Sequence, residues 1–227
     1  VTASNYKTLT IDSGVEFDLG VGEGFILMNK LEFLDTSGEW FYDSNTATVY
    51  LWTPKGDSPE NYEIRGSVFE NGIVVGSNKD YITISDLEIL EQANKGIYMR
   101  LNSYVVVNNN NFINQDQYGL YCLGTSDNCS ITNNYASGQN VRGIYFVSAD
   151  SDVSDNQVEN IGLFDNIGVN STDETLFGVG IDIYGNSPGS ENTIRYNRIK
   201  NTGYTGLYFR GKSIVEYNYI SHTCLVK

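Results

Sequence analysis

The sequence predicts an all-β protein, a right-handed parallel β-helix in which short strands stack in successive coils. Three observations support this prediction. A motif with a central Asn recurs at about the length of one coil, a Gly-aliphatic motif alternates with it, and polar and apolar residues alternate over short stretches. No helical period of 3.6 residues is sustained, and the Leu-x-x-Leu-x-Leu pattern of leucine-rich repeats is absent.

The first motif is an aliphatic residue, two spacers, Asn, one spacer and an apolar residue. Strands of successive coils lie about 4.8 Å apart, so equivalent Asn side chains are expected to form a ladder between coils. Its members are Asn110, Asn134, Asn156, Asn197 and Asn218, while an earlier copy carries Leu87 at this position. The aliphatic residues should form one inward stack of Ile84, Val107, Ile131, Val153, Ile194 and Val215. Alternatively, these Asn residues merely occupy turns with positive φ.

The second motif begins each strand that follows, at Gly72-Ile73, Gly96-Ile97, Gly119-Leu120, Gly143-Ile144, Gly180-Ile181 and Gly206-Leu207. If the aliphatic residue points inward, the next residue points outward. One outward row then contains Tyr98, Tyr121, Tyr145, Asp182 and Tyr208. Two residues further along, a second row contains Arg100, Leu123, Val147, Tyr184 and Arg210.

Two parts of the chain are expected. Residues 1–66 lack the clean repeat, and their aromatic stretches around residues 44–46 predict a β-hairpin that packs on or forms the first coils. Residues 67–227 form the coils, with an insertion at residues 163–178, and inserted loops usually lie on the binding face of a solenoid. No polar cap follows the last copy of the Asn motif, which predicts a fragment of a longer protein.

Composition narrows the classes of function. The net charge of −14 disfavours binding to nucleic acid and to anionic lipid, and no apolar stretch is long enough for membrane insertion. A neutral ligand fits this charge, as does an anionic ligand bridged by Ca²⁺. The three cysteines follow no metal motif, so Cys122, Cys129 and Cys224 are predicted to be small buried residues.

The stretches GEWFYD at residues 38–43, YLW at 50–52 and YITISDL at 81–87 resemble secreted bacterial right-handed β-helix proteins. That group includes glycoside hydrolases, polysaccharide lyases and surface proteins. The resemblance implies an extracellular or cell-surface protein that acts on carbohydrate, as a monomer or as part of a longer multidomain chain. In related hydrolases the coil at residues 218–223 continues into an Asp-Gly-Gly segment, which would lie beyond Lys227. The Asn/Glu/Glu calcium cluster of the lyases, with its following Lys and Arg, is absent.

The outward rows are the candidate binding site, because tyrosine rings stack on sugar rings and arginine binds hydroxyls or carboxylates. The predicted substrate-binding residues are Tyr98, Tyr121, Tyr145, Tyr184, Tyr208 and Arg210. Stacked tyrosines that only stabilise the sheet remain the alternative.

Glycoside hydrolysis needs two carboxyl groups. Asp182 is the predicted catalytic residue, with Asp165, Asp173 or Glu174 of the insertion as its partner; a solvated acidic loop is the alternative for those three. His222 matches a polar turn residue of other coils, and a general base is the alternative. No cofactor is predicted, although a weak Ca²⁺ site at Asp150, Asp152 and Asp155 stays open despite the absence of EF-hand spacing.

We therefore expect a carbohydrate-active β-helix protein, with a glycoside hydrolase favoured over a polysaccharide lyase. A non-catalytic glycan-binding or adhesion module is the competing function, because fold alone does not separate an enzyme from a binding module.

Overall fold

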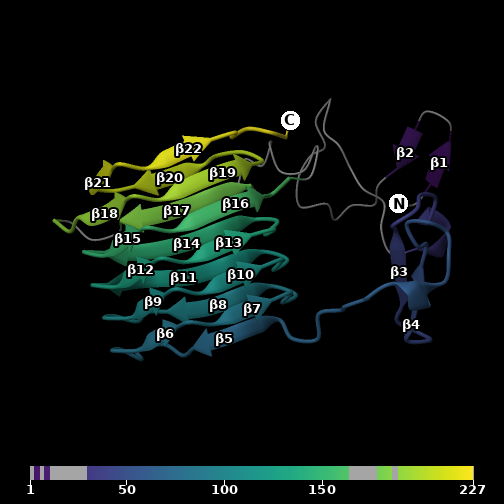
Figure 1. The fold of residues 1–227 in the computed structure, drawn as a ribbon, viewed down its shortest axis with the longest axis horizontal. Helices are drawn as coiled ribbons and strands as arrows, with labels where there is room; N and C mark the ends of the chain where they lie inside the picture. Colours follow the sequence, from purple (N-terminus) through teal and green to yellow (C-terminus); the bar gives the residue numbers. More distant parts are fainter. Residues whose placement is uncertain (1–2, 6–7, 11–29, 164–177, 186–188, 227) are drawn as a thin grey trace.

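The computed structural model describes residues 3–5, 8–10, 30–163, 178–185 and 189–226. Most of these residues form a solenoid of coils, each of which contributes one strand to each of three parallel sheets (Figure 1). Sheet I contains β5 (Asn71–Val75), β8 (Lys95–Arg100), β11 (Tyr118–Asp127), β14 (Arg142–Ala149), β17 (Val179–Gly185) and β20 (Leu207–Arg210). The predicted right-handed parallel β-helix is confirmed, and it has about 6 turns.

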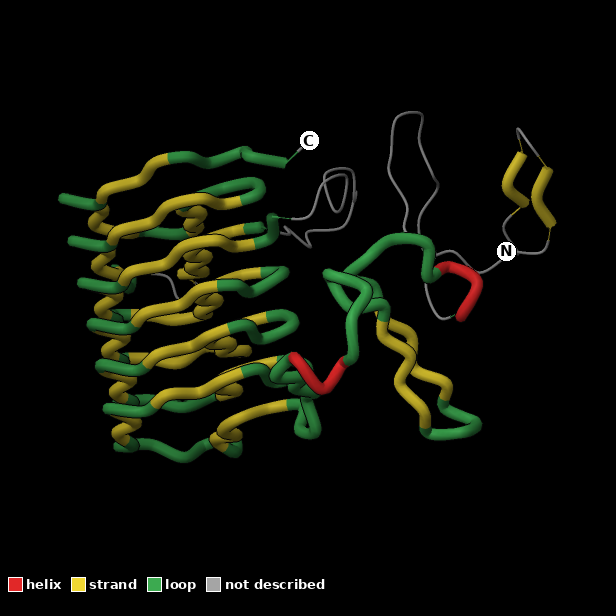
Figure 2. Tube along the Cα trace, turned by 45° about the vertical axis from the view of Figure 1, so that its right-hand side comes forward, coloured by secondary structure: helices red, strands yellow, loops and turns green. Residues whose placement is uncertain are grey.

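The other two sheets complete each coil. Sheet II contains β6 (Thr83–Ser85), β9 (Val106–Asn108), β12 (Ser130–Thr132), β15 (Asp152–Ser154), β18 (Asn192–Arg195) and β21 (Ser213–Glu216). Sheet III contains β7 (Glu88–Leu90), β10 (Asn111–Ile113), β13 (Tyr135–Ser137), β16 (Gln157–Ile161), β19 (Arg198–Thr202) and β22 (Tyr219–Ser221). Figure 2 shows the strands of successive coils running one above another.

The N-terminal part contains two antiparallel pairs. Strands β1 (Ala3–Asn5) and β2 (Thr8–Thr10) form one, and β3 (Trp40–Asp43) and β4 (Thr48–Leu51) form the other. The second pair is the predicted hairpin, in which the rings of Phe41 and Tyr50 stack with centroids 6.0 Å apart. Two short 3₁₀ helices, η1 (Leu31–Phe33) and η2 (Pro59–Asn61), lie outside the coils (Figure 2). That residues 1–66 pack on the first coils stays a prediction.

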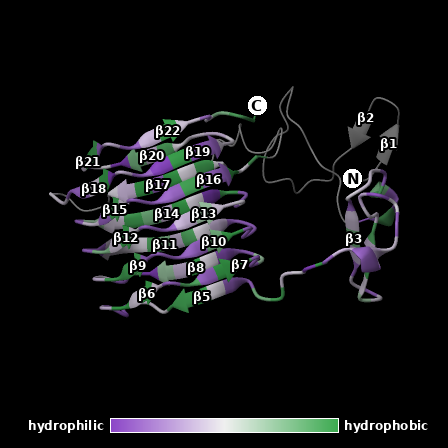
Figure 3. Cartoon of the chain, in the orientation of Figure 1, coloured by the Kyte–Doolittle hydropathy of each residue, from purple (hydrophilic) through white to green (hydrophobic). Residues whose placement is uncertain are grey.

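The interior is built from rows of apolar side chains in register. The predicted inward stack is confirmed, because its residues pair in register along sheet II in the order Ile84, Val107, Ile131, Val153, Ile194 and Val215. All are buried except Val215, which lies on the last described strand of sheet II and is 38% exposed. Hydrophobic and hydrophilic residues alternate along the strands in Figure 3. This alternation separates an apolar interior from a polar outer surface.

The asparagine ladder is also confirmed. Asn134 Nδ2 donates to Asn156 Oδ1 at 3.0 Å and to the Val107 carbonyl at 2.9 Å. The same pattern recurs at the neighbouring rungs. Positive φ belongs to the residue before each rung, for example Asn133 at 55°, and not to the rung itself. The alternative that the rungs only satisfy a backbone conformation is therefore wrong, because their amides bond from coil to coil.

The Gly-aliphatic motif marks where the backbones of two coils approach closely. A Cβ atom added at Gly119 would lie 2.7 Å from the carbonyl oxygen of Gly143 in the next coil. Only glycine leaves room for that carbonyl. The recurrence of glycine at this position therefore follows from stacking, and it positions the strands of sheet I that carry the outward rows.

Two smaller predictions have different outcomes. Cys122 and Cys129 are buried as expected, but Cys224 is exposed, so its prediction was wrong. Cys224 follows the last strand, β22, and no further described coil covers it. His222 is exposed with φ of 52° and occupies the turn position of Asn114 and Asn201, which confirms it as a turn residue.

Candidate functional site

The first outward row lies where the sequence predicted it. Its members pair in register on consecutive strands of sheet I, and we call them the outer row: Tyr98, Tyr121, Tyr145, Asp182 and Tyr208. The residues on either side of each tyrosine in β8, β11 and β14 are buried, whereas the tyrosines are half-buried. These phenol rings therefore stand on the outer face of the solenoid and remain partly accessible.

The tyrosine rings form a nearly continuous run across four strands. Ring centroids lie 5.8 Å apart for Tyr98–Tyr121, 5.0 Å for Tyr121–Tyr145 and 5.8 Å for Tyr145–Tyr184. Burial raises the pKa of Tyr145 to about 12 and also raises the pKa of Tyr121. The phenols therefore stay neutral at physiological pH and can donate hydrogen bonds.

Arg210 completes the run on β20. Its guanidinium carbon lies 4.5 Å from the ring centroid of Tyr184 and 5.1 Å from that of Tyr208, and its Nε donates to the Tyr208 hydroxyl at 2.8 Å. The six predicted substrate-binding residues thus occupy one face of sheet I. Their binding role is a prediction that this placement allows.

Asp182 belongs to the outer row, yet its side chain is fully buried. Arg142 Nε lies 2.8 Å from Asp182 Oδ2. Burial raises the pKa of Asp182 from 3.8 to about 6, because loss of solvent outweighs the opposing charges of Arg142 and Arg210. Alternation along the strand predicted an outward carboxylate correctly, but could not show that neighbouring side chains cover it.

Three residues of this face were missed by the sequence analysis: Lys95, Tyr118 and Arg142. They begin consecutive strands of sheet I, and they pair in register. Counting back from Ile144 by strict alternation places Arg142 on the inward side, but its guanidinium reaches the outer row at Asp182. Arg142 Nη1 also donates to the Tyr118 hydroxyl at 3.2 Å. The sequence contained a signal that could have found these residues, because each one immediately precedes the Gly of the Gly-aliphatic motif.

The structure does not test the other predicted catalytic residues. Asp165, Asp173 and Glu174 of the insertion lie outside the described residues, so their catalytic role stays a prediction. Within the described ranges, no group of His, Cys, Asp and Glu side chains is arranged to hold a metal ion. Asp152 instead lies 3.8 Å from Arg195.

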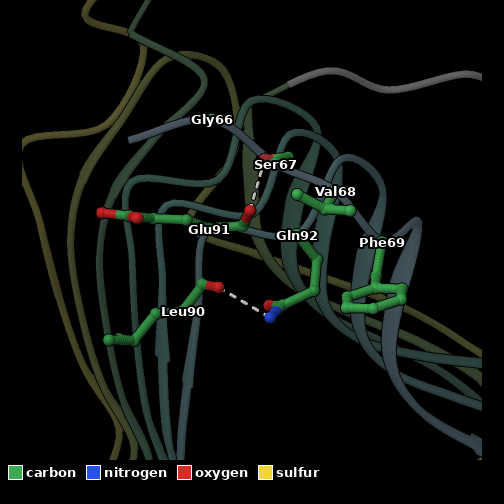
Figure 4. Close-up of a pocket in the computed structure, with 7 residues that line it drawn as sticks. All are labelled: Gly66, Ser67, Val68, Phe69, Leu90, Glu91 and Gln92. Atoms are coloured by element: carbon green, nitrogen blue, oxygen red, sulfur yellow. Dashed lines mark hydrogen bonds between the residues drawn. The ribbon is translucent and has the colours of Figure 1, made fainter. Parts of the chain in front are cut away.

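A small hollow of about 220 Å³ lies at the first coil, between residues 66–69 and the turn at residues 90–92 (Figure 4). The Ser67 hydroxyl donates to the Glu91 carbonyl, and Gln92 Nε2 donates to the Leu90 carbonyl at 2.6 Å. These polar groups bond to the chain itself. The hollow includes none of the outer-row residues.

Among the residues that the structure describes, no helix has the length and apolarity that a membrane span requires.

Comparison with known proteins supports the fold. A family model described as the right-handed β-helix region matches residues 24–189 and residues 71–226. No curated protein and no solved structure matched the chain. The two matched regions together cover most of the chain and all of the described coils, in agreement with the stacked parallel sheets. This chain therefore belongs to the right-handed β-helix family.

Proposed function

We propose that this protein is carbohydrate-active and binds a glycan along the outer face of sheet I. The observation that carries the proposal is the run of tyrosine rings from β8 to β17, with neighbouring centroids 5.0–5.8 Å apart. Rings held in place by one another offer flat apolar surface at a low cost in conformational entropy. Such surfaces suit the apolar faces of sugar rings.

The repeat of the solenoid supports a linear ligand. A glycan lying along the solenoid axis would cross one strand about every 4.8 Å. It would therefore meet a ring or a guanidinium in successive coils, from Tyr98 on β8 to Arg210 on β20. Phenol hydroxyls and the guanidinium provide hydrogen-bond donors for sugar hydroxyls. We further propose that the protein acts at or outside the cell surface, alone or within a longer chain. This function requires neither nucleic acid nor insertion into a membrane.

Binding of the intact chain to a glycan array tests this proposal, with Tyr121→Ala as the variant. Tyr135→Ala is the matched control, because Tyr135 is a half-buried tyrosine on β13 of sheet III, where its hydroxyl donates to Glu159 at 2.7 Å. Loss of one stacking ring should weaken binding about tenfold or more in the first variant. Equal affinities of the two variants would instead assign the tyrosines to sheet stability.

A glycoside hydrolase is the second candidate function. The observation that favours it is the Asp182 carboxyl, which has a pKa of about 6 and is therefore partly protonated near neutral pH. A raised pKa suits a general acid in this reaction. Because Asp182 is fully buried, catalysis would require its cover to move aside, and a second carboxylate would come from Asp165, Asp173 or Glu174.

An assay for released reducing sugar separates the enzyme from a binding module. Glycans that bind on the array should be incubated with wild type and with Asp182→Asn. Release by wild type that falls at least a hundredfold in the variant supports the hydrolase. Equal release removes Asp182 from the mechanism, and binding without release favours the non-catalytic module.

A further inference from the structure

Lys95 has an unusual environment on the outer face of sheet I. Its Nζ lies 5.6 Å, 5.7 Å and 5.0 Å from the ring centroids of Tyr98, Tyr118 and Tyr121. Nζ donates one hydrogen bond, to Asn94 Oδ1 at 2.7 Å. An ammonium group carries three donors, so two are left for other acceptors.

A comparison with Arg142 shows what Lys95 lacks. Both residues begin strands of sheet I, and both are in register with Tyr118, which lies between them. Arg142 is paired with Asp182, the outer-row residue of the next strand. The outer-row residue of the strand next to Lys95 is Tyr121, a neutral phenol. Across the described part of the chain, no carboxylate oxygen lies within 4.0 Å of Lys95 Nζ.

Among the described residues, this arrangement leaves a partly desolvated cation with no carboxylate in direct contact. Burial lowers the pKa of Lys95, and the negative charge of Glu70 opposes that change only in part. The faces of aromatic rings attract a cation, yet they accept no strong hydrogen bond. An anionic group that reaches Nζ would supply both the missing charge and the missing acceptor.

The charges within the strands of sheet I agree with an anionic ligand. The strands of sheet I contain the cations Lys95, Arg100, Arg142 and Arg210, but only the acids Asp127 and Asp182. Asp182 is already paired with Arg142. This excess of positive charge lies on a chain whose net charge is −14. A positive strip on a negative protein draws an anion to one place.

We propose that Lys95 binds the carboxylate or sulfate group of an acidic sugar whose ring lies against Tyr98 and Tyr121. This inference rests on the proposed function and extends it, because it assigns an acidic glycan as the ligand class and β8–β11 as the subsite for its charge. The sugar ring would contact the same tyrosine run, while the anionic group would take one or both of the remaining donors of Lys95.

Calorimetric binding measurements with matched oligosaccharides test this subsite. One pair is a galacturonate oligomer and the same oligomer with its carboxylates reduced to alcohols; the other is a sulfated glucan oligomer and its desulfated form. The variant is Lys95→Gln, with Lys95→Arg as the conservative replacement. Lys200→Gln is the matched control, because Lys200 is a half-buried lysine on β19 of sheet III.

We expect wild type to prefer the anionic member of at least one pair, and the preferred pair identifies the carboxylate or the sulfate as the ligand. Lys95→Gln should weaken binding of that anionic oligomer about tenfold, as expected for loss of a charge-assisted hydrogen bond. Its affinity for the uncharged member should change less than twofold. Lys95→Arg should retain most of the preference, and Lys200→Gln should behave like wild type.

Other outcomes overturn the inference in distinguishable ways. Equal affinity for charged and uncharged oligomers, or a preference that survives in Lys95→Gln, removes the acidic subsite while the proposed function stands. A wild-type protein that binds none of these oligomers and none on the array removes both proposals. Equal losses in Lys95→Gln and Lys200→Gln would show that only net charge matters.

Discussion

The asparagine ladder and the outer row of sheet I are both stacks of one residue per coil, yet they differ in which side chains recur and in what those side chains bond to. In the ladder the side chain recurs unchanged, and each described rung from Asn110 to Asn197 donates to its neighbour. In the outer row tyrosine gives way to Asp182 in one coil. Asp182 is paired with Arg142, whereas Lys95, three strands away in sheet I, contacts no carboxylate among the described residues. The amides of the ladder therefore bond to one another, whereas the outer row keeps tyrosine rings partly accessible on the surface, which makes it the candidate site.

The largest expected effect concerns the close approach between coils. Gly143→Ala places a Cβ atom 2.8 Å from the carbonyl oxygen of Gly180, which belongs to the backbone and moves only if the coils separate. We expect a loss of about 3 kcal/mol in the free energy of unfolding, measured by chemical denaturation. Gly66→Ala is the control, since its added Cβ would have no atom within 4 Å. Equal stability of the two variants would show that the coils are not held at this spacing.

The second prediction concerns pH and Asp182. Its pKa is raised from 3.8 to about 6, so the folded protein binds more protons than the unfolded chain between these values. The free energy of unfolding should therefore fall as pH rises from about 4 to about 6, by up to about 3 kcal/mol. Asp182→Asn, which stays neutral, should remove this fall; its absolute stability also includes the cost of removing the carboxylate beside the buried guanidinium of Arg142. Denaturation curves between pH 4 and 8 measure the difference.

Asp152→Asn serves as the control for this pH profile, because the Asp152 side chain is partly exposed and lies 3.8 Å from Arg195. Its profile should follow that of wild type, since partly exposed ion pairs contribute little. A fall between pH 4 and pH 6 that persists in Asp182→Asn would show that the pKa of Asp182 is not its cause.

The third prediction concerns the ladder. Asn134→Ala removes the acceptor of the Asn110 backbone N–H, at 3.1 Å, and the donor to the Val107 carbonyl. Buried groups left without partners should cost about 1–3 kcal/mol in the free energy of unfolding. Asn111→Ala, at an exposed position of β10, should stay within about 0.5 kcal/mol of wild type. If the rungs only satisfied a backbone conformation, the two variants would have similar free energies of unfolding.

The sequence predicted the rows because their spacing along the chain becomes adjacency in a solenoid. One copy of each motif per coil is enough to place Asn134 on Asn110 and Tyr145 on Tyr121. The same reasoning failed at Arg142, since a residue at the start of a strand does not follow strict alternation. It also failed to give the burial of Asp182, which depends on side chains from neighbouring coils and not on the period.

The most direct test compares a variant of the structural ladder with a variant of the proposed binding row. It measures stability and glycan affinity together for Asn134→Ala and Tyr121→Ala, with a glycan that binds wild type. We expect different effects: Asn134→Ala lowers the free energy of unfolding and keeps its affinity, whereas Tyr121→Ala loses affinity about tenfold, more than any accompanying loss of stability explains. Affinity that falls in both variants in proportion to stability would contradict the assignment of the outer row to binding.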